Sequence, residues 1–272
     1  MQPAGGLPDL YVANDGGGSI LKLKNSDYSP DGTITDGING PLDVSLDLSG
    51  NLFVANATGA NVTEYPPGAS SPSFAYSTGM IEPLFVSNDA RGNVYEVDSA
   101  NPDGVGDNDG FVNEYAPQTN TVLHSCAPGA HPMGIAIDGK GDVFLALNSS
   151  SAHGHVVEYK RGLNGCKATT LGPQLGFVAG IALDKDANLM AADYDASQVF
   201  VFAPPYTKIT RRLAHGGRES QPYYVSINGS NSLVYVTNFS KSGVFVVDYA
   251  SGKVIRKVNG DAGTFDGPHA VY

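Results

Sequence analysis

A unit of about 45 residues recurs along the chain, and this repeat restricts the possible folds more than any other feature. Each copy begins at a proline or valine and contains a short apolar strand, a turn, and a second apolar strand that ends in Asn or Asp. A third apolar strand follows, and the complete copies start at Pro41, Pro83, Pro132, Val178 and Pro222. A repeat of this length, with three strands and room for a fourth, is typical of a propeller blade.

The two ends of the chain are fragments of the same unit. The N-terminal region, residues 9–38, starts at the second strand, and residues 268–272 supply a first strand. Pairing between them would complete a sixth blade and leave no open strand edge. The sequence therefore predicts an all-β, six-bladed β-propeller over residues 1–272, a single domain whose ring is closed by the N- and C-terminal strands.

An Asn or Asp ends the second strand of every blade. A residue that recurs in all blades is expected to be structural, because a catalytic residue should break the repeat. Short polar side chains of this kind bind backbone amides in turns. We therefore interpret six residues as turn caps rather than catalytic groups: Asn14, Asn56, Asp98, Asn148, Asp193 and Asn238.

The repeat P-x-G-I-A-x-D-x-x-G-x-L-x-V-A-N resembles the NHL repeat and related six-bladed propellers. The copies PMGIAID-GKGD-VFLALN and PLDVSLD-LSGN-LFVAN carry this resemblance, which covers nearly the whole chain. The resemblance implies a propeller fold. Propellers of this kind include protein-, glycan- and RNA-binding platforms, sensor domains, lactonases and lyases, so the fold does not select a function.

Composition excludes two classes of partner. Lys and Arg number 16 against 27 Asp and Glu, and the net charge of -11 argues against nucleic-acid binding. No apolar run approaches the roughly 18 residues that a membrane-spanning helix needs. With 41% hydrophobic residues the chain can bury a core. We expect a monomer that binds a protein, a glycan or a small molecule.

Residues beside the leading proline of each blade are expected to surround the mouth of the central channel. Glu82 and His131 precede this proline in their blades, and His269 follows the last one. Two imidazoles and a carboxylate can hold Zn²⁺ or a similar cation with an open position for water, or act as a general acid and base. These three residues are the candidate catalytic group.

Further mouth residues are candidates for ligand binding. Gln221, Tyr223 and Met133 flank the leading prolines, and His153 and His155 alternate in a Ser-rich loop of blade four. The two histidines either chelate a metal or are simply exposed.

Lactonase-type propellers, which the resemblance includes, hold a central divalent cation with Glu, Asn and Asp, the last two just after the leading proline. This sequence instead has apolar or aromatic residues there: Leu42, Leu84, Met133, Ala179 and Tyr223. The missing pattern argues against a calcium-dependent lactonase. The apolar set either lines a mouth suited to an apolar or aromatic ligand, or plugs the channel.

Blade three contains the largest insertion, which carries four carboxylates: Asp98, Asp103, Asp107 and Asp109. The segment D-x-D-G resembles the middle of a calcium loop. A true EF-hand is not expected, because Val105 and Ala116 stand where carboxylate ligands are required. An improvised Ca²⁺ site and a solvated acidic loop remain as alternatives.

The two cysteines, Cys126 and Cys166, are separated by close to one repeat, which places them within bridging distance in neighbouring blades. They either form a disulfide, which fits an exported protein, or are two buried thiols. The first eight residues lack the features of a signal peptide, so we expect that such a segment has been removed and that the protein is extracellular or periplasmic.

The sequence thus favours an exported, noncatalytic binding or scaffold propeller of NHL-repeat type, with its ligand on the channel-mouth face. The alternative is a metal-assisted hydrolase or lyase that uses His131, His269 and Glu82 with a bound divalent cation.

Overall fold

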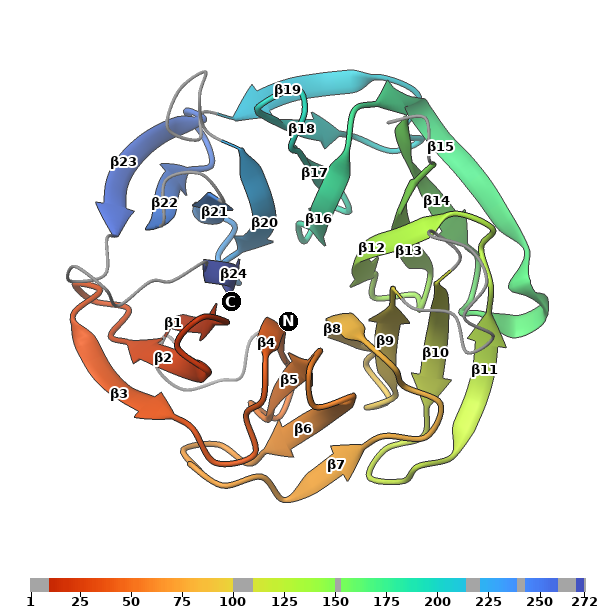
Figure 1. Cartoon of the computed structure of the whole chain (residues 1–272). Helices are drawn as coiled ribbons and strands as arrows, with labels where there is room; N and C mark the ends of the chain where they lie inside the picture. Colours follow the sequence, from red (N-terminus) through yellow and green to blue (C-terminus); the bar gives the residue numbers. More distant parts are fainter. Residues whose placement is uncertain are drawn as a thin grey trace.

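The protein is an all-β, six-bladed propeller, as the sequence predicts (Figure 1). The computed structural model describes residues 10–99, 110–149, 153–213, 221–238, 243–258 and 268–271, and for the last segment it describes the strand alone. Within these residues, 24 strands form six four-stranded antiparallel sheets arranged around a common centre. We number the blades one to six in chain order, and blade one is the sheet β24-β1-β2-β3.

Each blade has its first strand at the ring centre. These innermost strands are β24 (Pro268–Val271), β4 (Pro41–Leu46), β8 (Pro83–Asn88), β12 (His131–Ile137), β16 (Val178–Leu183) and β20 (Pro222–Ile227). The second strands are β1 (Leu10–Asn14), β5 (Leu52–Asn56), β9 (Val94–Asp98), β13 (Val143–Asn148), β17 (Leu189–Asp193) and β21 (Leu233–Asn238).

The third strands are β2 (Ser19–Leu23), β6 (Asn61–Tyr65), β10 (Phe111–Tyr115), β14 (Gly154–Tyr159), β18 (Gln198–Phe202) and β22 (Gly243–Asp248). The outer strands are β3 (Pro30–Ile34), β7 (Phe74–Tyr76), β11 (Val122–Cys126), β15 (Ala168–Leu175), β19 (Ile209–Leu213) and β23 (Lys253–Val258). A short 3-10 turn, η1 (Asn164–Cys166), precedes β15.

Packing between neighbouring blades explains the composition of the strands. All residues of β5, β9 and β17 are buried, because a sheet lies against each of their two faces. Outer strands such as β23 expose most of their residues. The apolar clusters join blades: Phe53 and Tyr76 of blade two pack with Val86 and Tyr115 of blade three.

Blade one closes the ring from both chain ends. Val12 and Asn14 of β1 are the register partners of Val271 and Pro268 of β24 in an antiparallel ladder. The predicted closure between the terminal strands is therefore present, and β1 pairs on both sides within its blade.

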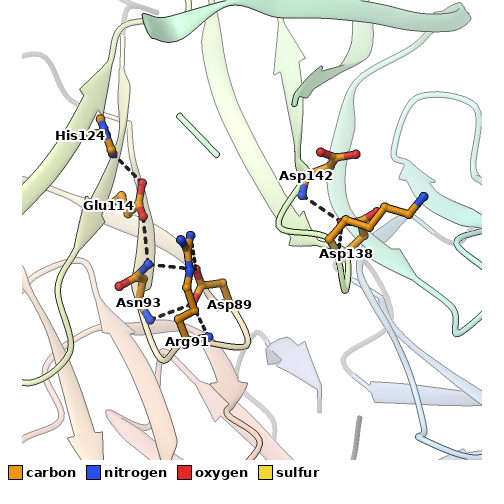
Figure 2. A network of polar contacts seen from close by, with 8 residues as sticks. Asp89, Arg91, Asn93, Glu114, His124, Asp138 and Asp142 are labelled. Atoms are coloured by element: carbon orange, nitrogen blue, oxygen red, sulfur yellow. Dashed lines mark hydrogen bonds and ion pairs between the residues drawn. The ribbon is translucent and has the colours of Figure 1, made fainter. Parts of the chain in front are cut away.

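Aspartates close the turns between first and second strands. In blade four, Asp138 Oδ1 accepts hydrogen bonds from the backbone N–H of Lys140 (2.8 Å) and of Asp142 (2.9 Å), as Figure 2 shows for the latter. Gly141 in this turn has φ +81, a left-handed conformation that glycine adopts without steric cost. The Gly-containing turns of the repeat are thus required by the backbone geometry.

Three of the six recurring residues at the end of the second strand, Asn56, Asp98 and Asp193, are caps, as the sequence predicts. Asn56 Oδ1 accepts from the N–H of Asn39 at 3.0 Å, and Asp193 Oδ2 accepts from the N–H of Gly176 at 2.8 Å. Each bond ties the end of a second strand to the segment that leads into the first strand of the same blade. The caps therefore fix the loops at one end of the propeller.

Two aromatic side chains close the channel. Phe85 of β8 and Tyr224 of β20 belong to blades on opposite sides of the ring, and their ring centroids lie 4.7 Å apart. Both residues are buried, at 3% and 5% exposure. The plug is therefore formed by the residues that follow Leu84 and Tyr223 in the sequence, and not by the apolar set itself.

Glycines let the innermost strands of blades four, five and six touch. Gly134 and Gly180 occupy the repeat position of Phe85 and Tyr224. A Cβ atom at Gly134 would lie 2.6 Å from the carbonyl oxygen of Ala179, and one at Gly180 would lie 2.8 Å from Cα of Tyr224. Only glycine fits at these contacts, and this close approach leaves space for the plug on the other side.

Candidate functional site

The loops that lead into the innermost strands, together with those that join second to third strands, form one end of the propeller. We call this end the mouth face and the opposite end the turn face. The mouth face contains the candidate residues of the sequence analysis and the outer surface of the plug. It is therefore the part of the fold where an exposed site must be sought.

A continuous row of aromatic side chains crosses the mouth face from blade five to the channel. Phe177 and Tyr194 have ring centroids 6.1 Å apart, and Tyr194 and Tyr223 have centroids 6.2 Å apart at an interplanar angle of 86°. Tyr223 continues to Tyr224 at 5.2 Å, and Tyr224 contacts the plug residue Phe85. We call Phe177, Tyr194, Tyr223 and Tyr224 the aromatic row.

Backbone contacts in blade five hold the outer part of the row. Tyr194 donates its backbone N–H to the carbonyl oxygen of Phe177 at 2.8 Å. Asp195 Oδ2 accepts from the N–H of Phe177 at 3.0 Å, so its carboxylate lies at the backbone of the first residue of the row. Phe177, Tyr194 and Tyr223 are partly exposed, whereas Tyr224 is buried. Burial raises the pKa of Tyr223 to about 12, so its hydroxyl stays neutral at physiological pH.

The charges in the described loops of this face are negative. Its described loops expose four carboxylates, those of Asp15, Asp36, Glu82 and Asp195, and contain no Lys or Arg. By contrast, the loops of the turn face contain eight basic residues among those described: Lys24, Arg91, Lys140, Lys160, Arg161, Lys167, Lys185 and Lys208. The two ends of the propeller therefore present different electrostatic surfaces.

The three candidate catalytic residues come from three blades. Glu82 is exposed and its Oε2 accepts from the hydroxyl of Ser99 at 2.7 Å. His131 is half-buried on β12; burial lowers its pKa, and the charge of Glu82 acts in the opposite direction. His269 lies on β24 of blade one, across the ring from blade four. Glu82 and His131 are thus neighbours, and the side chain of His269 lies outside the described residues.

The candidate ligand-binding residues differ in accessibility. Tyr223 and Gln221 are half-buried at the mouth of blade six, and Tyr223 is part of the aromatic row. Met133 is 2% exposed and packs in the core. His153 is exposed, and His155 is half-buried on β14, where burial lowers its pKa.

Of the four carboxylates proposed for Ca²⁺, only Asp98 lies within the described residues; Asp103, Asp107 and Asp109 lie outside them. Asp98 is fully buried and accepts hydrogen bonds from the N–H groups of Ile81 (2.6 Å) and Glu82 (3.0 Å). Among the described side chains, no three His, Cys, Asp or Glu residues gather closely enough to hold a metal ion.

Two buried carboxyls escaped the sequence analysis. Asp43 lies on the innermost strand of blade two, where its Oδ2 accepts from the N–H of Val86 at 2.9 Å, and burial raises its pKa to about 8. Glu96 is fully buried on β9, where Asn113 donates to its Oε2 at 3.0 Å. Burial and the neighbouring charge of Asp98 raise the pKa of Glu96 well above its usual value. Comparing these two positions across blades would have revealed both, because other blades have apolar residues or glycine there.

Figure 2 shows a polar cluster in the outer part of blade three. His124 Nδ1 lies 2.8 Å from Glu114 Oε2, and Asn93 donates to Glu114 Oε1 at 3.1 Å. Asn93 also donates to Asp89, which pairs with Arg91 at 3.0 Å. The Asp89 turn and the outer strand are thereby joined to a buried carboxylate on β10. We interpret this cluster as a connection between strands.

A disulfide joins two neighbouring blades. Cys126 ends β11 of blade three and Cys166 ends η1 in blade four, with Cα atoms 5.5 Å apart. Such a bond is compatible with an oxidising compartment outside the cytoplasm. Among the residues that the structure describes, no helix is both long and apolar enough to cross a membrane.

Comparison with solved structures shows the propeller fold. A chain in a nidogen/laminin complex aligns with a TM-score of 0.75 and 15% identity, covering 97% of both chains. A protein of unknown function from Bacteroides caccae aligns with a TM-score of 0.70 and 15% identity, covering 98% of both chains. No protein-family model and no curated protein matches the sequence. At this identity, the likeness extends to the fold alone.

Proposed function

We propose that this chain is an exported, noncatalytic binding propeller of NHL-repeat type, formed as one domain, whose ligand binds on the mouth face. The aromatic row carries this proposal, because partly exposed Phe177, Tyr194 and Tyr223 offer large contact areas at little cost in side-chain entropy. The disulfide is consistent with export. A propeller of similar fold was solved in a complex of nidogen with laminin, which makes a protein a reasonable class of ligand.

Ligand arrays test the proposal. We expect the protein to bind a member of an array of extracellular proteins, glycans and small molecules, and Tyr223→Ala to weaken that binding about tenfold. Lys185→Ala on the turn face is the matched control and should leave the affinity unchanged. Circular dichroism verifies that both variants fold. If Lys185→Ala weakens binding and Tyr223→Ala does not, the ligand binds on the turn face and the proposal is wrong.

Elemental analysis separates this function from the hydrolase or lyase. We expect the double variant His131→Ala/His269→Ala to have the same metal content as the wild type, because a binding propeller does not need these imidazoles. The metalloenzyme instead requires about one equivalent of Zn²⁺ or a similar ion in the wild type and its loss in the variant. Protein purified without a histidine tag or a chelator is the appropriate sample.

A further inference from the structure

Ring geometry and charge together indicate which ligand the mouth face suits. Each ring of the aromatic row has an electron-rich face, which attracts cations placed within about 6 Å of its centroid. Tyr194 and Tyr223 stand nearly perpendicular, so their faces point in different directions. A cation beside this pair contacts the face of one ring while its apolar stem packs against the other.

The carboxylates of this face favour the same charge. Asp195 lies beside Phe177, since its Oδ2 accepts from the backbone N–H of that residue. A carboxylate thus stands near the outer end of the row, and Asp15, Asp36 and Glu82 are exposed in other described loops of the same face.

We propose that the mouth face binds a basic segment of a partner protein, whose Arg or Lys side chains lie on the rings of Phe177, Tyr194 and Tyr223 and pair with Asp195. This inference rests on the proposed function, because it uses the same face. Arg suits such a site well, since its planar guanidinium stacks on aromatic rings and binds carboxylates through paired hydrogen bonds. The negative charge of the whole chain adds attraction at long range.

Fluorescence anisotropy with a short labelled peptide of alternating Arg and Gly tests the inference. The same peptide with citrulline in place of Arg is the control, because citrulline has the same shape without the charge. We expect the Arg peptide to bind and the citrulline peptide to bind at least about tenfold more weakly. Added salt should lower the affinity of the protein for the Arg peptide. Equal binding of both peptides would overturn the inference and indicate a neutral ligand that stacks on the rings.

Paired variants locate the binding peptide on the aromatic row. Tyr194→Leu keeps an apolar side chain but removes the ring, so it should lower the affinity for the Arg peptide about threefold to tenfold. Tyr194→Phe keeps the ring and should bind the peptide like the wild type. Asp195→Asn should lower the affinity for the Arg peptide about threefold, because the charge is lost while the amide oxygen still accepts from the N–H of Phe177. Asp186→Asn, in an exposed turn of the opposite face, is the matched control.

The outcomes distinguish this inference from the proposed function. If Asp186→Asn lowers the affinity for the Arg peptide as much as Asp195→Asn does, binding depends on net charge alone and the inference fails. If no Arg peptide binds but an array ligand is lost in Tyr223→Ala, the inference fails while the proposed function stands. If the array ligand instead depends on the turn face, the proposed function fails together with the inference.

Discussion

Reduction of the Cys126–Cys166 disulfide is expected to lower the free energy of unfolding by about 4 kcal/mol. The bond spans a sequence separation of 40 residues, and a cross-link of this span removes about that much chain entropy from the unfolded state. It also joins two blades, so its loss affects the interface between blades three and four. Urea unfolding followed by circular dichroism, with and without reductant, measures the change. Circular dichroism is a better signal here than tryptophan fluorescence, because the chain contains no Trp.

A cysteine-free variant provides the control. Cys126→Ala/Cys166→Ser leaves the chain without cysteine, because the sequence contains only these two. Alanine suits position 126, where the side chain is buried among apolar residues. The variant should match the reduced wild type within about 1–2 kcal/mol and should not respond to reductant. Equal stability of the oxidised and the fully reduced wild type, with reduction shown by thiol titration, would refute the prediction.

The wild type is expected to lose stability as the pH rises from about 4 to about 8, and Asp43→Asn should remove much of this loss. Burial raises the pKa of Asp43 from 3.8 to about 8, so the folded protein holds this proton more tightly than the unfolded chain does. Stability is therefore fully present below the unfolded pKa and decreases until the pH passes the folded pKa. Since each tenfold change in proton affinity is worth about 1.4 kcal/mol, the loss amounts to about 5 kcal/mol.

Asparagine resembles the protonated aspartate, because it keeps an oxygen that accepts the N–H of Val86 and has no charge to bury. We expect Asp43→Asn to be more stable than the wild type at pH values near 8 and similar to it near pH 4. Urea unfolding at a series of pH values measures the difference. Asp36→Asn, at an exposed position of the same end, should follow the wild type. Parallel pH profiles for Asp43→Asn and the wild type would show that Asp43 titrates normally.

The repeat predicts much of the fold because the same physical requirement occurs six times. Inner strands need apolar residues, and each second strand needs an Asn or Asp such as Asn56 to cap the adjoining loop. The outer strands have no comparable signature. Phe74–Tyr76 has three residues, and β23 exposes most of its side chains, so neither packing nor turn chemistry marks such strands in the sequence.

The site was harder to predict, because it depends on contacts between blades. The place of Tyr223 beside a leading proline marks it as a candidate in the sequence. Tyr194 instead follows the cap Asp193 in another blade, and only the folded ring brings the two ring centroids to 6.2 Å from each other. Met133 has the same repeat position as Tyr223 but is buried in the core. Position in the repeat therefore indicates the end of the propeller on which a residue lies, but not how far its side chain is exposed.

Closure of the ring by β1 and β24 determines the order in which the protein can fold. β1 is the first of the described strands and β24 is the last, so their contact has the largest sequence separation among the described strand pairs, and such contacts form slowly. During synthesis, β1 leaves the ribosome before the other described strands of the ring, and β24 leaves after them. The edge of β1 that pairs with β24 therefore stays available to other chains until residues 268–271 have been made, and pairing with them protects the nascent protein from aggregation.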